Sequence, residues 1–268
     1  LAVADGKAFY GSEGDGRCQY VETDGDCTYR LVDKQYNNGY LPSVDAQIYV
    51  ISGQGAGQTR RIVWNSGNEF KVDNPFTIRP NRNSKIIIRY CRNDLYYVNN
   101  TYHNGNAGGF FGGCADVVYD GNKHTRHGNF YFQPFYGDVN WYISIVNDTF
   151  EDAYVFHNNG WYDSDMERSQ FAWLRFLTHN TGMNSNICTT VRRNSFDSTK
   201  LDFSIQSKND MVCAIIDRNA FLNLDSAVNF LIAGNHIDGL LAYRNSAINC
   251  TALYNDLFVT AMSYRNSV

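Results

Sequence analysis

The sequence has little of what long amphipathic helices and membrane spans require. Lysine and glutamate are scarce, and no run of about 18 apolar residues occurs. No CxxC or CxxH spacing is present, so we expect neither a metal site nor a cofactor. The 23 basic and 27 acidic residues give a net charge of -4. We therefore expect no phosphate-neutralising groove, no nucleic acid partner and no membrane insertion.

Aromatic residues and turn formers are abundant instead. The chain has 19 Tyr, 17 Phe and 22 Gly among its 268 residues, together with very many Asn. This composition favours an all-β protein, either as one elongated domain or as two ordinary ones. The sequence begins without Met and stops inside a repeating pattern, so we expect it to be part of a longer or processed chain.

The strongest signal is an internal repeat. Arg193-Asn194-Ser195-Phe196 recurs as Arg218-Asn219-Ala220-Phe221, and similar segments follow apolar runs elsewhere. Intervals of 22 to 26 residues separate the repeated positions, which are Asn100, Asn122, Asn147, Ser169, Asn194, Asn219 and Asn245. A register of this kind predicts stacked coils of one superhelix.

Each interval contains two β-like runs, and the first run alternates apolar and polar residues, as in Leu201–Ile205. Such strands with Asn at one corner favour a parallel β-helix. Asn tolerates a left-handed turn, and its amide can donate to one neighbouring coil and accept from the other. We therefore predict a structural ladder of asparagines, with an aromatic residue two places later filling the interior. The ladder comprises Asn100, Asn122, Asn147, Asn194, Asn219 and Asn245.

On these motifs, residues 85–268 resemble right-handed parallel β-helix proteins of the pectin-lyase-like superfamily. Pectin lyases, polysaccharide hydrolases, phage tailspikes and surface adhesins share this architecture. The resemblance implies a fold and leaves the function open.

Residues 1–84 lack the repeat and form a separate β-rich entry module in this prediction. The stretch 53–62 with the segments 72–76 and 80–84 resembles a module of secreted β-helix and phage tail proteins. In that module the Gly-rich segment makes a hairpin and a Pro-aromatic pair opens the next strand. Phe76 stands where Trp is frequent, and Asn81 where Asp is frequent. A phosphate-binding loop is excluded, because no Lys-Ser/Thr follows the last Gly of the segment.

The seven cysteines are an odd number. Cys18 and Cys27 flank a short loop and are predicted to form a local disulfide. Two further pairs, Cys91 with Cys114 and Cys188 with Cys213, are separated by about one coil, so each pair is expected to stack on neighbouring turns. Whether these pairs and Cys250 form disulfides or stay as buried thiols is left open.

Alignment of the first strands on the Asn positions predicts two outward columns. One contains Gln133, His157, His179 and Gln206, and the other contains Ala153, Arg175, Asp202 and Asn229. A histidine base and an arginine that neutralises a uronate carboxylate would suit a polysaccharide lyase. Asp163 and Asp165 form an alternative carboxylate pair for hydrolysis. A solvated polar face without chemistry is the third possibility.

Aromatic residues on predicted loops favour carbohydrate binding, because sugar rings stack on exposed aromatic faces. The predicted sugar-binding residues are Tyr136, Trp161, Tyr162, Gln133 and Gln206. The expected function is an extracellular, cell-surface or virion rod that presents glycan-binding loops, with homo-oligomer or fibre assembly left open. A secreted polysaccharide lyase or glycoside hydrolase is the alternative.

Overall fold

The structure is a computed structural model, and the parts of the chain that it describes are all-β. These parts are residues 21–23, 28–31, 44–66, 69–81, 84–103, 108–111, 113–126, 130–134, 139–152, 154–156, 166–168, 172–177, 185–205, 210–223, 226–232, 236–238, 241–250, 252–254 and 263–267. Among them no helix occurs that is long and apolar enough to cross a membrane.

An antiparallel sheet forms the N-terminal module, with strand order β1-β2-β5-β4-β3-β6. The strands are β1 (Val21–Thr23), β2 (Thr28–Leu31), β3 (Gln47–Ser52), β4 (Thr59–Ser66), β5 (Glu69–Val72) and β6 (Lys85–Arg89). The Gly53–Gly57 segment closes the β3–β4 hairpin, as predicted. Gly55 has φ +84°, and a Cβ there would lie 2.7 Å from the Ile78 carbonyl oxygen.

Two details of the module differ from the prediction. Pro75 and Phe76 do not open a strand; they lie in the segment between β5 and β6, and the Phe76 ring is buried in the module core. The strand β6 pairs with β3, so the module's sheet continues to Arg89, past the predicted boundary at residue 84.

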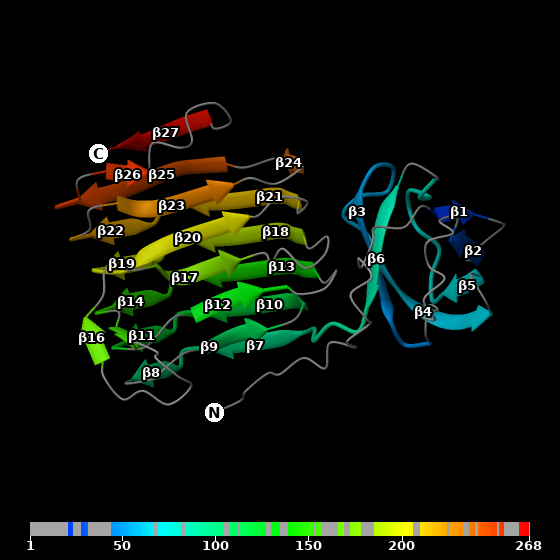
Figure 1. The fold of residues 1–268 in the computed structure, drawn as a ribbon, viewed down its shortest axis with the longest axis horizontal. Coiled ribbons are helices and arrows are strands. Elements are labelled where there is room, and N and C mark those ends of the chain that lie inside the picture. Colours follow the sequence, from blue (N-terminus) through cyan, green and yellow to red (C-terminus); the bar gives the residue numbers. More distant parts are fainter. Residues whose placement is uncertain are drawn as a thin grey trace.

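The remaining strands form a parallel β-solenoid whose coils stack one on another (Figure 1). One face is made of long strands, namely β7 (Leu95–Val98), β10 (Cys114–Asp120), β13 (Val139–Val146), β18 (Ser185–Arg192), β21 (Asp210–Asp217) and β25 (Leu241–Ile248). Short strands follow each corner, namely β8 (Thr101–His103), β11 (Lys123–Thr125), β14 (Thr149–Glu151), β19 (Ser195–Asp197) and β22 (Ala220–Leu222).

The third face is a sheet of β9 (Gly108–Phe111), β12 (Phe130–Gln133), β17 (Ala172–Leu177), β20 (Lys200–Ile205), β23 (Ser226–Ile232) and β26 (Ala252–Tyr254). Beside these faces, β24 (His236–Asp238) pairs with β21, and β27 (Ser263–Ser267) pairs with β25. The predicted parallel β-helix is confirmed.

One coil departs from the predicted length. Ladder residues of neighbouring coils are separated by 22, 26, 25 and 26 residues, but by 46 residues between Asp148 and Asn194. An antiparallel hairpin of β15 (Tyr154–Phe156) and β16 (Met166–Arg168) is inserted into that coil. The prediction that Ser169 marks a separate coil is therefore wrong, since β12 pairs directly with β17.

A chain of side-chain amides runs along the corner between long and short strands. Asn194 Nδ2 donates to Asn219 Oδ1 at 3.0 Å, and Asn219 Nδ2 donates to Asn245 Oδ1 at 3.0 Å. The same two oxygens also accept the backbone N–H of the preceding ladder residue. We call this row the amide ladder, and its members are Asn100, Asn122, Asp148, Asn194, Asn219 and Asn245.

The prediction placed Asn147 in this row, and that assignment is wrong by one residue. Asp148 is buried in the ladder, whereas Asn147 is exposed and donates to Asp120 at 2.7 Å. The left-handed conformation also belongs to the residue before each ladder position, not to the ladder residue itself. Those preceding residues are Asn99, Gly121, Asn147, Arg193, Arg218 and Arg244.

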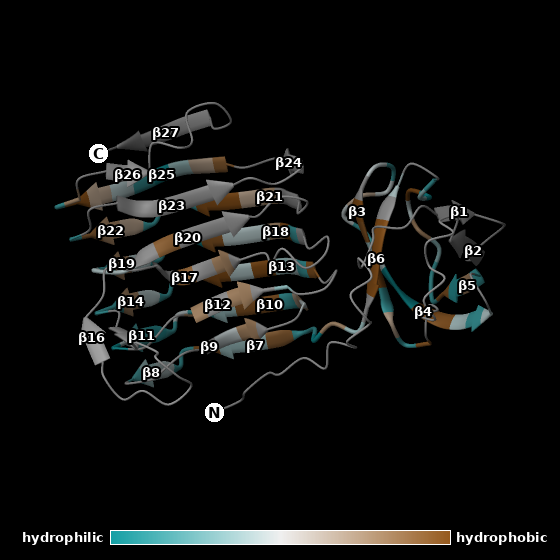
Figure 2. Cartoon of the chain, viewed as in Figure 1, coloured by the Kyte–Doolittle hydropathy of each residue, from teal (hydrophilic) through white to brown (hydrophobic). Residues whose placement is uncertain are grey.

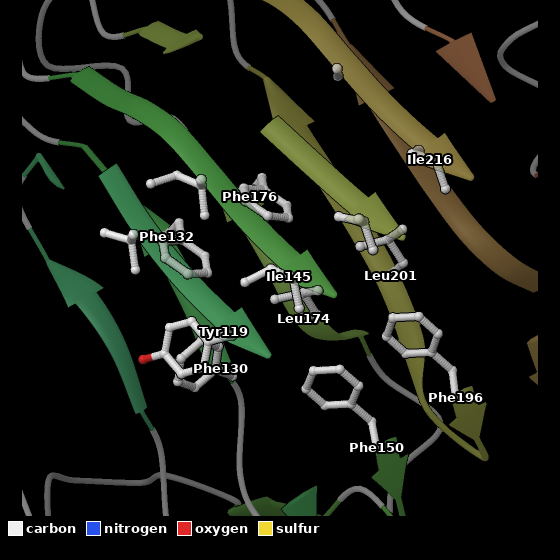
Figure 3. Close-up of a cluster of buried hydrophobic side chains, with 14 of the residues drawn as sticks. Tyr119, Phe130, Phe132, Ile145, Phe150, Leu174, Phe176, Phe196, Leu201 and Ile216 are labelled. Carbon is white, nitrogen blue, oxygen red and sulfur yellow. The ribbon is translucent and has the colours of Figure 1, made fainter. Parts of the chain in front are cut away.

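Aromatic rings stack inside the solenoid two residues after the ladder. The rings of Phe150 and Phe196 are 5.0 Å apart between centroids, and those of Phe196 and Phe221 are 4.9 Å apart. His124 takes the same place one coil earlier, stacked on Phe150 at 4.5 Å. On the opposite wall Phe132 stacks on Phe176 at 5.1 Å (Figure 3). These buried rings supply much of the apolar area that stabilises the solenoid.

The N-terminal module packs against the beginning of the long strands (Figure 1). Apolar residues line β6 and the long strands (Figure 2). Tyr49 of β3 lies 5.0 Å from Trp141 of β13 between ring centroids, and the Tyr142 hydroxyl donates to the Gly57 carbonyl at 3.2 Å. Burial raises the pKa of Tyr49, so its phenol stays neutral in this junction.

Replacing Asn219 by Ala should lower the free energy of unfolding by about 3 kcal/mol, because buried partners on both neighbouring coils lose their hydrogen bonds. Asn219 Nδ2 also donates to the Val191 carbonyl at 3.0 Å, so this carbonyl loses a hydrogen bond in the variant too. Urea denaturation followed by circular dichroism measures the change. Asn147→Gly, which keeps a left-handed conformer, is the matched control and should cost under about 1 kcal/mol. Equal losses in both variants would contradict the ladder assignment.

Replacing Asp148 by Asn should raise stability by about 1 kcal/mol. The Asn residues of the ladder donate through Nδ2 to the next coil, and a carboxylate has no N–H to offer Asn194 there. Thermal unfolding at pH 7 measures the shift. Asp120→Asn, on the outer surface, removes the same charge and should change the midpoint little. A lower midpoint for Asp148→Asn would mean that the contact with His124, 3.8 Å from Oδ2 to Nε2, contributes more than the missing donor.

Candidate functional site

The predicted outward column on the third face is preserved in part. Arg175 of β17 pairs with Asp202 of β20, and Asp202 pairs with Asn229 of β23. These three residues therefore stack on neighbouring coils. Ala153, the first predicted member, lies outside the described residues, and the direct partner of β17 on the other side is β12.

Three of the four members of the second predicted column, His157, His179 and Gln206, lie outside the described residues, so the column stays a prediction. Phe132, Phe176 and Phe203 are paired on neighbouring strands. Gln133 comes one residue after its paired Phe, whereas His179 and Gln206 each come three residues after theirs in the sequence. The strand β15, which precedes His157, is part of the inserted hairpin, so the coil that was to place His157 beside His179 does not exist.

Most predicted site residues cannot be placed. His157, His179, Asp163, Asp165, Tyr136, Trp161, Tyr162 and Gln206 lie outside the described residues, as do Cys18 and Cys27. Among the described residues, no group of three or more His, Cys, Asp or Glu is arranged to hold a metal ion.

A charged corner that the prediction missed lies on the upper coils. Three arginines gather around one carboxylate where the long strands end, and a fourth, Arg193, follows the first of them in the chain. We call this group the arginine corner, and it consists of Arg192, Arg193, Asp217, Arg218 and Arg244. Its sequence signal was present in the repeat, since an Arg precedes the Asn in each of these coils. Only the Asn of that motif had been assigned a role.

Asp217 holds the corner together from inside. Its side chain is fully buried and stands at the end of β21, directly between Arg192 of β18 and Tyr243 of β25 in register. Arg192 Nε donates to Asp217 Oδ2 at 2.8 Å, and Arg244 Nε donates to Oδ1 at 2.9 Å. Hydrogen bonding to this carboxylate raises the pKa of Arg244.

Three of the arginines stand in a backbone conformation that disfavours them. Arg193, Arg218 and Arg244 have φ of 56°, 55° and 53°, in the left-handed region. That region costs an ordinary L-residue roughly 1–2 kcal/mol, and Gly and Asn adopt it more readily. The lower coils place Asn99, Gly121 and Asn147 at the same position. Arg244 donates to the buried Asp217, but Arg193 and Arg218 form no hydrogen bond to that carboxylate in the described structure, so another role for these two guanidinium groups is indicated.

The charges in this corner do not cancel. One carboxylate faces three guanidinium groups, those of Arg192, Arg218 and Arg244, and these side chains are 36%, 43% and 44% exposed. Arg193 is also exposed, and within the described residues no carboxylate pairs with it. The corner is therefore a local cationic surface on a chain of net negative charge.

This arrangement suits the binding of anions. A guanidinium group presents two parallel N–H donors to a carboxylate or sulfate, which makes a strong and directional contact. Neighbouring coils repeat at about 4.8 Å, so the arginines form a regular row along the solenoid axis. The Arg244 guanidinium also lies over the Tyr243 ring at 4.4 Å. An extended polymer with repeated acidic groups would meet several of these side chains at once.

Comparison of the sequence with known protein families and with curated proteins gave no match.

Replacing Asp217 by Asn should lower stability by about 1–3 kcal/mol, because a buried carboxylate that accepts from two arginines is replaced by a neutral amide. Urea denaturation at low ionic strength measures the loss. Arg218→Gln is the matched control, since Arg218 Nε is 3.9 Å from Asp217 and mostly faces solvent; it should cost under about 0.5 kcal/mol. A loss of the same size in the control would show that Asp217 does not organise the corner.

Proposed function

We propose that this chain is a β-helical rod of a surface fibre or virion tail, acting outside the cell, and that it binds an acidic polysaccharide along the arginine corner. The observation that carries the proposal is the row of arginines in left-handed conformation on successive coils. A rod with identical spacing between coils offers a repeating ligand a repeating set of contacts.

The ligand class follows from charge and shape. Carboxylate or sulfate groups on a sugar polymer are spaced along one chain, and they can be bound by a narrow row of cations. A nucleic acid requires a broader basic surface, and the net charge of -4 opposes it. The resemblance to secreted β-helix proteins supports a location outside the cell and assembly into a larger fibre.

A polysaccharide lyase is the second candidate, favoured by one observation. Arg175 and Asp202 stand in register on neighbouring strands of the third face. An arginine that neutralises a uronate carboxylate beside an acid or base is what proton abstraction from such a sugar requires. Release of unsaturated product would identify a lyase, and new reducing ends would identify a hydrolase.

Binding to immobilised polygalacturonate, heparin and neutral dextran tests the main proposal. The wild-type chain should bind the two acidic polymers, more weakly at higher salt, and should not bind dextran. The double variant Arg193→Gln/Arg218→Gln should lose about tenfold or more in affinity, because two charge-assisted contacts are removed. Biolayer interferometry measures the dissociation constants.

Arg61→Gln is the matched control, since Arg61 is an exposed arginine of β4 in the N-terminal module. It removes one positive charge away from the corner and should leave the affinity within about twofold. Equal losses of affinity in the corner and control variants would mean that overall charge explains the binding, and would overturn the proposed site. Absence of binding to either acidic polymer, or preference for a nucleic acid or for dextran, would overturn the ligand class.

A further inference from the structure

Two cysteines stand side by side on neighbouring coils of the long-strand face. Ile187 pairs with Val212 and Thr189 pairs with Ala214, so Cys188 of β18 and Cys213 of β21 occupy the same register. Both are free thiols in the structure and both are half-buried. We propose that Cys188 and Cys213 form a dithiol site that a small-molecule disulfide oxidises to a cross-coil disulfide.

The backbone brings the two residues within bridging distance. Neighbouring strands lie about 4.8 Å apart, inside the range of about 4.4–6.8 Å that Cα atoms of a disulfide span. Cys188 and Cys213 have φ of 54° and 58°, so both side chains leave the strand in the same direction. The two thiols are already within hydrogen-bonding distance of each other.

The strand conformation at this column is unusual. Asp94, Asp116 and Tyr142 occupy the same column on earlier coils and also have positive φ, at 56°, 51° and 52°. The long strands therefore bend at this point in coil after coil. An acid or a tyrosine occupies the bend on the earlier coils, and thiols occupy it on two successive coils. A pair of stacked cysteines at a backbone position that disfavours ordinary residues indicates a use for the thiols.

The surroundings of the two cysteines favour the protonated, less reactive thiol at neutral pH. Burial, with the neighbouring Cys213 as a smaller cause, raises the pKa of Cys188 to about 11, so the thiol form dominates at neutral pH. The Tyr142 hydroxyl lies within hydrogen-bonding distance of Cys188 and also donates to Gly57 of the N-terminal module. Oxidation of the pair would thus tie two coils together beside the junction with the module.

The reaction balances with oxidised glutathione as the oxidant. One protein thiolate attacks a sulfur of glutathione disulfide, which forms a mixed disulfide and releases one glutathione thiolate. The second protein thiolate then attacks the protein sulfur of that mixed disulfide and releases the other glutathione. Two protein thiols have lost two electrons and two protons, and one glutathione disulfide has become two glutathione thiols.

Incubation of the native chain with oxidised glutathione tests the proposal. After acid quenching, alkylation and digestion without reduction, mass spectrometry should find one cross-linked peptide pair that contains Cys188 and Cys213. The rate should rise about thirtyfold between pH values of about 8 and 9.5, because the thiolate fraction of Cys188 increases about tenfold per pH unit below its raised pKa of about 11. The oxidised chain should also unfold at a higher temperature than the reduced one, since the cross-link restricts the unfolded chain.

Three single variants complete the experiment. Cys188→Ser and Cys213→Ser should each retain glutathione on the remaining cysteine, because the resolving thiol is missing. Cys250→Ser is the matched control and should still form the cross-link, since Cys250 lies on another coil near the Phe221 carbonyl. If a serine variant fails to fold, the peptide map of the wild-type chain decides alone. A wild-type chain that keeps glutathione on Cys188 or Cys213, or in which both stay open to alkylation, would overturn the proposal.

Discussion

The hydrogen bond from an amide on one coil to an amide on the next is the interaction on which the rest of this structure depends. Asn122, Asn194 and Asn219 each join the neighbouring coils through both oxygen and nitrogen. Each also donates to a backbone carbonyl, as Asn245 does to Ile216. These groups are buried, so any shift between coils would leave several of them without partners. The ladder therefore fixes the coil register, and the aromatic rings two residues later stack because that register is held.

The same constraint shapes the outside of the corner. The ladder amide turns inward because the backbone turns sharply just before it. This turn places the preceding residue in left-handed conformation on the surface. A side chain at that position is repeated once per coil whatever its chemistry. Where it is Asn or Gly, the corner is neutral, and where it is Arg, the fold produces a row of cations. The buried Asp217 accepts from Arg244 of this row and from Arg192 beside it, whereas the Arg218 Nε lies 3.9 Å away.

Prediction from sequence failed where two arrangements give the same spacing. The coil between Asp148 and Asn194 has 46 residues, which is close to twice the length of an ordinary coil, so an inserted hairpin looks like one additional coil. Asn147 and Asp148 are both short polar residues that suit a corner, and nothing local decides which one turns inward. The predicted column of His157 and His179 depended on that extra coil, and both residues lie outside the described part of the chain, whereas Arg175 and Asp202 lie beyond the insertion and share one register.

By itself the sequence determined the all-β architecture, the parallel coils and most of the amide ladder. Each of these depends on a residue type that recurs at a fixed interval, and an interval can be counted without coordinates. The stacking of Cys188 on Cys213 was likewise expected from their spacing of about one coil. The tertiary structure alone decided that Asp217 meets arginines from the coils on both sides. Such contacts join residues about a coil apart, and their existence depends on the pairing of strands rather than on any local preference of the chain.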